Sequence, residues 1–263
     1  MDTIFDFRGK TAVVAGGASG LGQGIADRLL EAGARVYICD LNQERAKKVA
    51  WDWCEKGADA RAVYIDGTNP SSLQEAADLI MQESGRIHYL VNTMGIGAKA
   101  REGEAWADTF RRVVGINMMG IFNSCTVFGE EMIKTGGGSI VNIASQAATI
   151  VPAKTRPGRG GEYGLIGYCT SKAGVKHMTR AMATLWAQSG IRANSVSPGY
   201  VDTPLTAEPH SDPQIRASMI AGIPLRRIAQ PYDIAGLVLF LLSDASSYLI
   251  AQDVIIDGGY TAQ

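Results

Sequence analysis

Short apolar runs rich in β-branched residues alternate with longer segments of helical periodicity along the whole chain. The apolar runs predict strands at 11–15, 35–39, 60–65, 89–92, 139–144, 192–196 and 254–256. The segments between them predict helices over 21–32, 43–56, 71–83, 106–134, 168–188 and 232–243. Strands that are apolar along their length and separated by helices are typical of a parallel sheet covered on both faces. The pattern therefore predicts a doubly wound α/β fold with a mostly parallel, seven-stranded sheet.

Two stretches interrupt this rhythm, at 151–161 and at 202–228. The first holds two prolines and the basic residues Lys154, Arg156 and Arg159, and the second holds four prolines. Both follow predicted strands, where open α/β sheets place their ligands, so we expect both to be substrate loops. The chain has no Pro/Ser-rich linker, internal repeat or low-complexity tract, which favours a single domain over residues 1–263.

Composition narrows the functional classes. The formal net charge is −1, which gives no basic surface for nucleic acid or anionic membranes. The N-terminus lacks the pattern of a signal peptide, and the longest apolar run, at 234–242, is shorter than the ~20 residues of a membrane span. We expect a soluble, cytoplasmic protein. The cysteines show no metal-ligand spacing and predict buried free thiols and no metal site; they are Cys39, Cys54, Cys125 and Cys169.

A glycine-rich segment joins the first predicted strand to the first predicted helix. Gly16, Gly20 and Gly22 lie in the sequence Ala-Gly-Gly-Ala-Ser-Gly-Leu-Gly. Glycines in this position let the backbone turn tightly and approach a pyrophosphate, which the N-terminus of the helix attracts. The strand before the glycines and the helix after them supply the context that a dinucleotide-binding site of the Rossmann type requires.

Asp40 ends the second predicted strand, 18 residues beyond Gly22. A carboxylate there can hydrogen-bond the hydroxyls of an adenosine ribose and would repel a 2′-phosphate. No Arg or Lys stands at Ala18, Ser19 or Leu41 to offset that repulsion. The sequence therefore predicts NAD rather than NADP. Asp40 could also be the N-cap of the next helix, a role compatible with the first.

Tyr168 and Lys172 are four residues apart in a predicted helix. This spacing places the two side chains on one helical face, about 5–6 Å apart at Cβ. A tyrosine whose pKa is near ~10 is a poor base at neutral pH, and a nearby cation stabilises its phenolate. The pair therefore indicates a tyrosine that exchanges protons with a substrate.

From Gly9 to Gly259 the chain resembles the short-chain dehydrogenase/reductase family. The motifs that carry the resemblance are Gly16-x-x-x-Gly20-x-Gly22, Asp66-Gly67, Asn92-Thr93-Met94-Gly95, Asn117, Ser145, Tyr168-x-x-x-Lys172, Pro198-Gly199-Tyr200-Val201-x-Thr203 and Asp257-Gly258-Gly259. The resemblance implies that cofactor contacts come from the glycine loop, the strand ends and the catalytic helix: Gly16, Ser19, Gly20, Leu21, Gly22, Asp40, Leu41, Asp66, Gly67, Asn92, Gly95, Tyr168, Lys172, Pro198, Gly199, Val201 and Thr203.

The resemblance also implies a catalytic set of Asn117, Ser145, Tyr168 and Lys172. In this scheme Tyr168 exchanges a proton with the substrate oxygen, Ser145 donates a hydrogen bond to that oxygen, and Lys172 lowers the pKa of Tyr168 and binds the nicotinamide ribose. Asn117 holds a water that links Lys172 to solvent. No metal takes part. The family further implies a homotetramer that pairs through the helices at 106–134 and 168–188.

Departures from the family pattern mark what is particular to this chain. Ala15 replaces a threonine whose hydroxyl often braces the glycine turn, and Thr93-Met94 replaces Asn-Ala, which predicts altered packing or affinity near the cofactor. His88 replaces a common aspartate and receives no role. The loop between Ser145 and Tyr168 is longer than in the family; its three basic residues either attract an anionic substrate or belong to a solvated or subunit-contacting loop.

The leading functional hypothesis is an NAD-dependent oxidoreductase that interconverts a secondary alcohol and a ketone. Polyols, sugars and sugar acids are the preferred small-molecule substrates, partly because the segment Ile4–Lys10 looks similar to that of family members acting on them. One alternative is a 3-oxoacyl-thioester reductase, which shares nearly all of the motifs. Another, of a different class, is a non-catalytic NAD-binding regulator, which would be expected to lack part of the catalytic set that this chain retains.

Overall fold

The fold is built on one sheet of seven strands. The structure, a computed structural model, describes residues 5–152, 161–207 and 211–263. The strand order is β3-β2-β1-β4-β5-β6-β7, and every pairing is parallel. The strands are β1 (Thr11–Ala15), β2 (Arg35–Asp40), β3 (Ala60–Tyr64), β4 (Tyr89–Asn92), β5 (Gly138–Ile143), β6 (Ile191–Pro198) and β7 (Asp253–Ile256).

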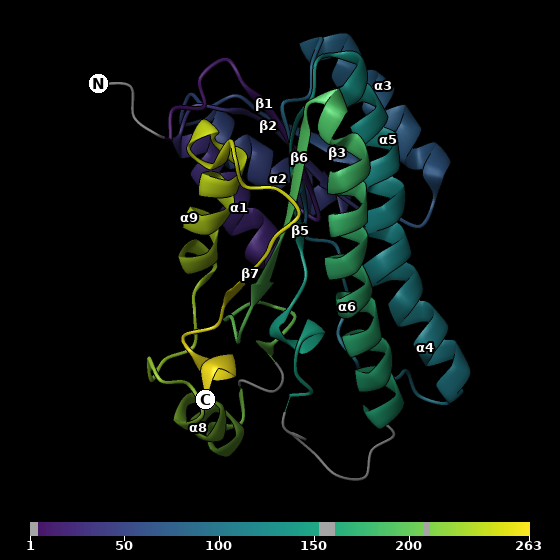
Figure 1. Ribbon diagram of the computed structural model, residues 1–263, viewed down its shortest axis with the longest axis vertical. Helices are drawn as coiled ribbons and strands as arrows, with labels where there is room; N and C mark the ends of the chain where they lie inside the picture. Colours follow the sequence, from purple (N-terminus) through teal and green to yellow (C-terminus); the bar gives the residue numbers. More distant parts are fainter. Residues whose placement is uncertain (1–4, 153–160, 208–210) are drawn as a thin grey trace.

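Helices cover both faces of the sheet, as the apolar strands predict (Figure 1). One core cluster joins the sheet to α1 (Gly20–Glu31), α2 (Gln43–Cys54) and α9 (Pro231–Leu242). The cluster on the other face joins it to α3 (Pro70–Ser84), α5 (Gly120–Lys134) and α6 (Gly161–Trp186). Because side chains alternate along a strand, Val14 enters the first cluster and Val13 the second.

The predicted elements are confirmed with shifts at their ends, and three regions differ from the prediction. The helix predicted at 106–134 is α4 (Trp106–Val114) and α5 joined by a π-helical turn, η1 (Gly115–Met119). Helix α6 begins at Gly161 and not at 168, so it includes the end of the predicted loop at 151–161. Residues 153–160, with Lys154, Arg156 and Arg159, lie outside the described residues.

Helix α8 (Pro213–Ala221) lies within the stretch 202–228 that was predicted to be a loop. Its start carries recognisable signals: Asp212 accepts hydrogen bonds from the amides of Gln214 and Ile215, and Pro213 occupies the first turn. Its periodicity is weak because only Met219 among its residues is buried, so the amphipathic pattern of a packed helix is missing.

The strand ends place the functional loops at one edge of the sheet. The order reverses between β1 and β4, and the connections after β1 and β4 diverge to opposite faces. Open α/β sheets bind ligands in the crevice formed at such a switch point. The glycine turn after β1, Asp40 at the end of β2, Ser145 after β5 and Pro198 at the end of β6 all meet at this edge.

The cysteines only partly follow the prediction of buried thiols. Cys39 and Cys125 are buried, and burial raises the pKa of Cys125 to about 12. Cys54 is exposed, because it ends α2 beyond the buried face of that helix, and Cys169 is half-buried. Among the described residues, none of the helices is both long enough and apolar enough to cross a membrane, and no cluster of three potential metal ligands occurs.

Candidate active site

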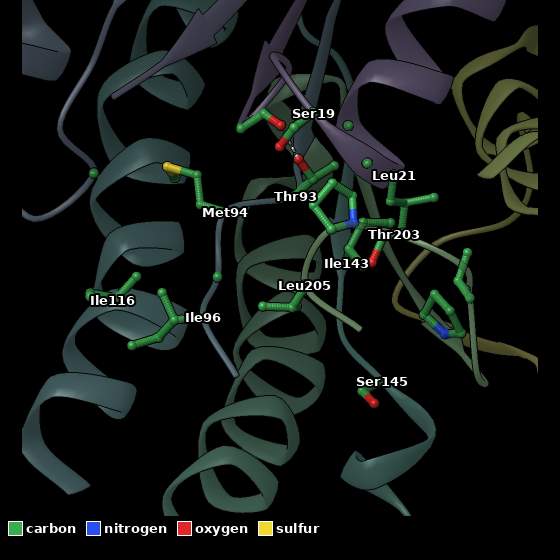
Figure 2. Close-up of a pocket in the computed structure, with 18 of the residues that line it drawn as sticks. Ser19, Leu21, Thr93, Met94, Ile96, Ile116, Ile143, Ser145, Thr203 and Leu205 are labelled. Carbon is green, nitrogen blue, oxygen red and sulfur yellow. Dashed lines mark hydrogen bonds between the residues drawn. The ribbon is translucent and has the colours of Figure 1, made fainter. Parts of the chain in front are cut away.

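A cavity of about 510 Å³ lies at the carboxyl edge of the sheet. Figure 2 shows Ser19, Leu21 and Thr93 gathered toward one end and Ser145 at the other. The cavity brings together nearly all of the residues predicted for the site: Gly16, Ser19, Gly20, Leu21, Gly22, Asp40, Leu41, Asp66, Gly67, Gly95, Ser145, Tyr168, Lys172, Pro198, Gly199, Val201 and Thr203. Asn92 and Asn117 are the predicted residues that do not line it.

The glycine turn is held against the end of β2. The amides of Gly16 and Gly17 donate to the Cys39 carbonyl at 2.8 and 3.1 Å. Gly16 has φ +84°, a conformation that favours glycine, and a Cβ on Gly22 would overlap the Gly16 carbonyl oxygen. Within the described residues, no side chain caps the first turn of α1. The first residues of this helix line the cavity, and a helix N-terminus without a side-chain cap suits an anion.

Thr93 occupies the space behind this turn. Its hydroxyl lies 2.9 Å from the Ala15 carbonyl oxygen and 3.0 Å from that of Gly16, and it donates to this pair. Its Oγ1 would also lie 2.7 Å from a Cβ on Gly16. The two departures noted in the sequence are thus related: the hydroxyl missing at Ala15 is supplied to the same turn from the neighbouring strand end by Thr93.

Asp40 lies beside the glycine turn with its carboxylate lining the cavity. One oxygen accepts from the Ala18 amide at 3.1 Å, and the other accepts from the Asn42 amide at 2.9 Å. The N-cap of α2 is Asn42, whose side chain accepts from the Arg45 amide, so the suggestion that Asp40 caps this helix is wrong. Each carboxylate oxygen keeps a second lone pair for a further donor.

The third strand end contributes Asp66 and Gly67. Asp66 accepts from the amide and the hydroxyl of Thr68 at 2.8 and 2.7 Å, which closes a tight turn. The Gly67 carbonyl accepts from Asn123 on α5 at 3.0 Å. The Met94 sulfur would lie 2.7 Å from a Cβ on Gly67. Met94, which replaces the smaller alanine of the family pattern, therefore packs against this turn.

Ser145 and Tyr168 meet at the other end of the cavity. Ser145 follows β5, is 9% exposed, and its Oγ accepts from the Ala147 amide at 3.1 Å. Burial raises the pKa of Tyr168, a hydrogen bond with Ser145 lowers it, and the neighbouring Cys169 raises it further, with a net upward shift. Removal from water therefore outweighs the hydrogen bond in setting the pKa of Tyr168.

Lys172 is a buried cation, 5% exposed, that points into the same cavity. Its Nζ donates to the Ile143 carbonyl at 2.9 Å and lies 5.9 Å from the centre of the Tyr168 ring. Among the described residues no carboxylate pairs with it, and burial lowers its pKa to about 8. The ammonium form thus persists at neutral pH, with donors left for a ligand.

Asn117 and Asn92 are wholly buried and act through other residues. The Asn117 side chain accepts from the Ile96 amide at 2.7 Å and donates to the Ile96 carbonyl at 3.0 Å, which clamps the loop after β4. Asn92 donates to the Asn142 side chain at 2.8 Å and accepts from Ser124 at 2.6 Å. The Asn92 side chain therefore joins β4 to β5 and α5 in the core, and Asn92 does not line the cavity.

Sequence reasoning missed much of the apolar wall. A Cβ on Gly20 would lie 3.2 Å from the Cβ of Thr203. The segment after β6 therefore packs closely against the glycine turn. The Thr206 hydroxyl donates to the Val201 carbonyl at 2.6 Å and shapes this segment. In the sequence, a threonine soon after Pro198-Gly199 was the signal that could have indicated this closed segment. The unpredicted lining residues are Ile65, Thr68, Thr93, Met94, Ile96, Ile116, Ile143, Ala144, Pro204, Leu205 and Thr206.

Comparisons with known proteins agree with this arrangement. The family described as enoyl-(acyl carrier protein) reductase, adh_short_C2, matches residues 16–261. D-Threitol dehydrogenase of Mycolicibacterium smegmatis is 38% identical over 98% of this chain and 95% of its own length. The chain belongs to the short-chain dehydrogenase/reductase family. The earlier resemblance is thereby confirmed.

Solved structures show the same fold in this family. The crystal structure of gox2181 has a TM-score of 0.90 and 36% identity, covering 99% of this chain and 98% of the other. A gluconate 5-dehydrogenase from Burkholderia cenocepacia J2315, crystallised with NADP and tartrate, has a TM-score of 0.89 and 30% identity, covering 98% of each chain. As a short-chain dehydrogenase/reductase, the protein is an oxidoreductase that acts on CH–OH groups with a nicotinamide dinucleotide.

Proposed function

We propose that the protein is an NAD-dependent dehydrogenase that interconverts a secondary alcohol and a ketone on a polyol, sugar or sugar acid. The observation that carries the proposal is the cavity with a ribose-binding carboxylate, Asp40, at one end and Ser145, Tyr168 and Lys172 at the other. The similarity to a threitol dehydrogenase and a gluconate 5-dehydrogenase supports the substrate class.

The preference for NAD rests on the charge around Asp40. Among the residues that the structure describes, three charged ones line the cavity, Asp40, Asp66 and Lys172, and Lys172 belongs to the catalytic end. A 2′-phosphate beside Asp40 would therefore meet a carboxylate with no cation among the described lining residues to offset it. The neighbour from B. cenocepacia binds NADP, so family membership leaves the choice open and this local charge supports NAD.

The residues present fit the dinucleotide. The uncapped start of α1 would receive the pyrophosphate, Asp40 the adenosine ribose, and Lys172 the nicotinamide ribose, with further contacts from the segment Pro198–Thr203. When bound, the cofactor would accept or supply the hydride. Beside the positive ring of an oxidised nicotinamide, Tyr168 would lose its proton more readily, against the upward shift that burial imposes on its pKa.

Proton handling then falls to the chain's own side chains. Ser145 donates to the substrate oxygen and stabilises charge that develops there. Tyr168 accepts the alcohol proton during oxidation and returns it during reduction. Lys172, held by the Ile143 carbonyl, places a cation near the phenol. Asn117 fixes the loop at Ile96. A water bound between Asn117 and Lys172 would extend the proton path from Lys172 to solvent.

A substrate screen tests this function. Purified protein would be assayed for NAD reduction with polyols, sugars and sugar acids, and in the reverse direction with 3-oxoacyl thioesters. We expect turnover of at least one polyol, sugar or sugar acid, with NAD preferred over NADP. Activity confined to 3-oxoacyl thioesters would establish the second candidate, which is supported by a 32% identical relative, the 3-oxoacyl-[acyl-carrier-protein] reductase of Chlamydia pneumoniae. Cofactor binding without turnover of any class would overturn both.

The assembly proposed with this function is a homotetramer in the cytoplasm. Exposed apolar side chains on α5 and α6 suit subunit pairing, including Phe122 at 41% exposure and Leu185 at 78%. Light scattering at micromolar concentration would measure the solution mass. A monomer would remove the tetramer from the proposal without affecting the catalytic assignment.

A further inference from the structure

Helix α6 carries a row of basic side chains beyond the catalytic lysine. Lys172, Lys176 and Arg180 are spaced four residues apart and so share one face of the helix. Lys172 holds the Ile143 carbonyl at the end of β5, and Arg180 lies 3.4 Å from the Ala251 carbonyl before β7. Lys176 lies between them and contacts the turn that follows Ser145.

Lys176 bridges two parts of the molecule that are far apart in sequence. Its Nζ donates to the Thr149 hydroxyl at 3.1 Å and lies 3.2 Å from Asp253 Oδ2. The Asp253 side chain is only 4% exposed, and its other oxygen accepts from Ser195 and Ser197 at 2.6 and 2.8 Å. Within the described part of the chain Asp253 Oδ2 has no hydrogen bond, so Lys176 is its electrostatic partner, and an unpaired buried carboxylate is costly.

Thr149 closes the turn that begins at Ser145. The Ala147 amide donates to Ser145 Oγ, the Ala148 amide to the Ser145 carbonyl at 2.8 Å, and the Thr149 amide to the Gln146 carbonyl at 2.9 Å. These successive bonds make the turn η2 (Gln146–Ala148) a short, stiff unit. A constraint on Thr149 is therefore transmitted to the Ser145 hydroxyl. Asp253 is in turn fixed to β6, which leads into Pro198 and Gly199 of the cavity.

We infer that Lys176 and Asp253 form a positioning pair that holds the Ser145 turn against the catalytic helix. The pair keeps the Ser145 turn in place at the end of the cavity that Tyr168 also lines, and ties that arrangement to the strand that leads to the cofactor segment. Neither residue lines the cavity, and neither touches the reacting atoms. The inference rests on the proposed role of Ser145 and deepens it.

The principal variant is Lys176→Met, which keeps most of the aliphatic stem and removes the ammonium. We expect kcat to fall about ten-fold or more, since small displacements of catalytic groups cost up to ~100-fold, while the Kd for NADH measured by fluorescence stays within about two-fold. Lys176→Arg should recover much of the rate because it restores the charge. The matched control is Lys134→Met, which breaks an exposed ion pair with Glu131 on α5 and should leave kcat unchanged.

Two readouts separate positioning from a general loss of structure. The rise of kcat/KM with pH should move to higher pH in Lys176→Met, as in Ser145→Ala, because both weaken the hydrogen bond that lowers the pKa of Tyr168. Cys169 and Lys172, the described titratable neighbours of Tyr168, are unchanged in both variants. Hydrogen exchange of the amides at 147–149 should quicken in Lys176→Met and not in Lys134→Met.

Hydrogen exchange needs no substrate. It therefore distinguishes failure of this inference from failure of the proposed function. Any alcohol that the wild type oxidises serves for the rate comparison. Unchanged kcat and unchanged exchange in Lys176→Met would overturn the inference, as would equal losses in kcat and NADH affinity. If Lys176→Met fails to fold, Thr149→Val decides: a fall in kcat of about three-fold supports the pair, and an unchanged kcat with unchanged exchange overturns it.

Discussion

The two ends of the cavity are constructed differently. The nucleotide end is made largely of backbone. The amides of Gly16 and Gly17 donate to the Cys39 carbonyl, and the first residues of α1 line the site. The catalytic end is made of side chains from the turn after β5 and from α6, and its lysine, Lys172, is held by the carbonyl of Ile143, 29 residues away in sequence. The nucleotide end therefore tolerates little change in backbone shape, whereas the catalytic end depends on charge and burial.

This difference determines how each end responds to substitution. At the nucleotide end, loss of a hydrogen bond that holds the glycine turn should weaken cofactor binding and leave the rate of the chemical step unchanged. At the catalytic end, loss of a side chain should reduce turnover, and removing a buried charge should also change stability.

The largest expected effect is that of Tyr168→Phe. Removing the phenolic oxygen removes the proton acceptor, so kcat should fall by about 10³-fold, within the range of general acid–base catalysis. The Kd for NADH, measured by fluorescence titration, should change little because the cofactor contacts remain. Tyr248→Phe, at a fully exposed site, is the control. A Tyr168→Phe enzyme with near-normal kcat would remove Tyr168 from its role.

Asp40→Asn tests the charge at the nucleotide end. The amide keeps an acceptor for the Ala18 amide and removes the negative charge, so the ratio of kcat/KM for NAD over NADP should fall by about ten-fold, the equivalent of about 1.4 kcal/mol. Asp66→Asn should leave the ratio unchanged, because its carboxylate is occupied by Thr68 in a separate turn. An unchanged ratio in Asp40→Asn would refute the ribose contact.

Lys172→Met should stabilise the fold while it abolishes most turnover. Burial lowers the pKa of Lys172 to about 8, so the folded chain binds this proton less tightly than the unfolded chain, whose lysine pKa is near 10.5. Wild-type stability should therefore rise from pH 8 to about 10.5, where the unfolded state binds more protons. At pH 7 we expect the variant to gain on the order of 2 kcal/mol in the free energy of unfolding.

Urea unfolding at pH 7 and pH 9.5 measures this difference. The advantage of Lys172→Met should shrink at the higher pH, because the wild-type lysine then loses its proton. A variant that is less stable than wild type at pH 7 would show that the Ile143 hydrogen bond outweighs the cost of burying the charge.

Thr93→Val has the smallest expected effect. It keeps the shape of the side chain and removes the hydroxyl that bonds the Ala15 and Gly16 carbonyls, so the Kd for NADH should rise about five-fold, equivalent to about 1 kcal/mol, with kcat nearly unchanged. Adding Ala15→Thr returns a hydroxyl to the turn and should recover part of the affinity. A fall in kcat without a change in Kd would place Thr93 with the catalytic end.

The sequence allowed the nucleotide end to be predicted more fully than the catalytic surroundings. The glycine turn and Asp40 are local to a strand–turn–helix pattern, so their positions follow from chain order. The partners of Asn92 and Asn117 do not, because both amides are satisfied by residues distant in sequence. Helix α8 was missed because it buries only Met219, which leaves no apolar stripe to detect.

The sequence by itself determined the order of strands and helices, the glycine turn and the residue types of the catalytic set, because periodicity and motif spacing are local properties of the chain. Only the tertiary structure decided that Thr93 supplies the hydroxyl missing at Ala15, that burial raises the pKa of Tyr168, and that Lys176 joins Thr149 to Asp253. Hydrogen bonds across the sheet and removal from water depend on which residues meet in space, and chain order does not record this.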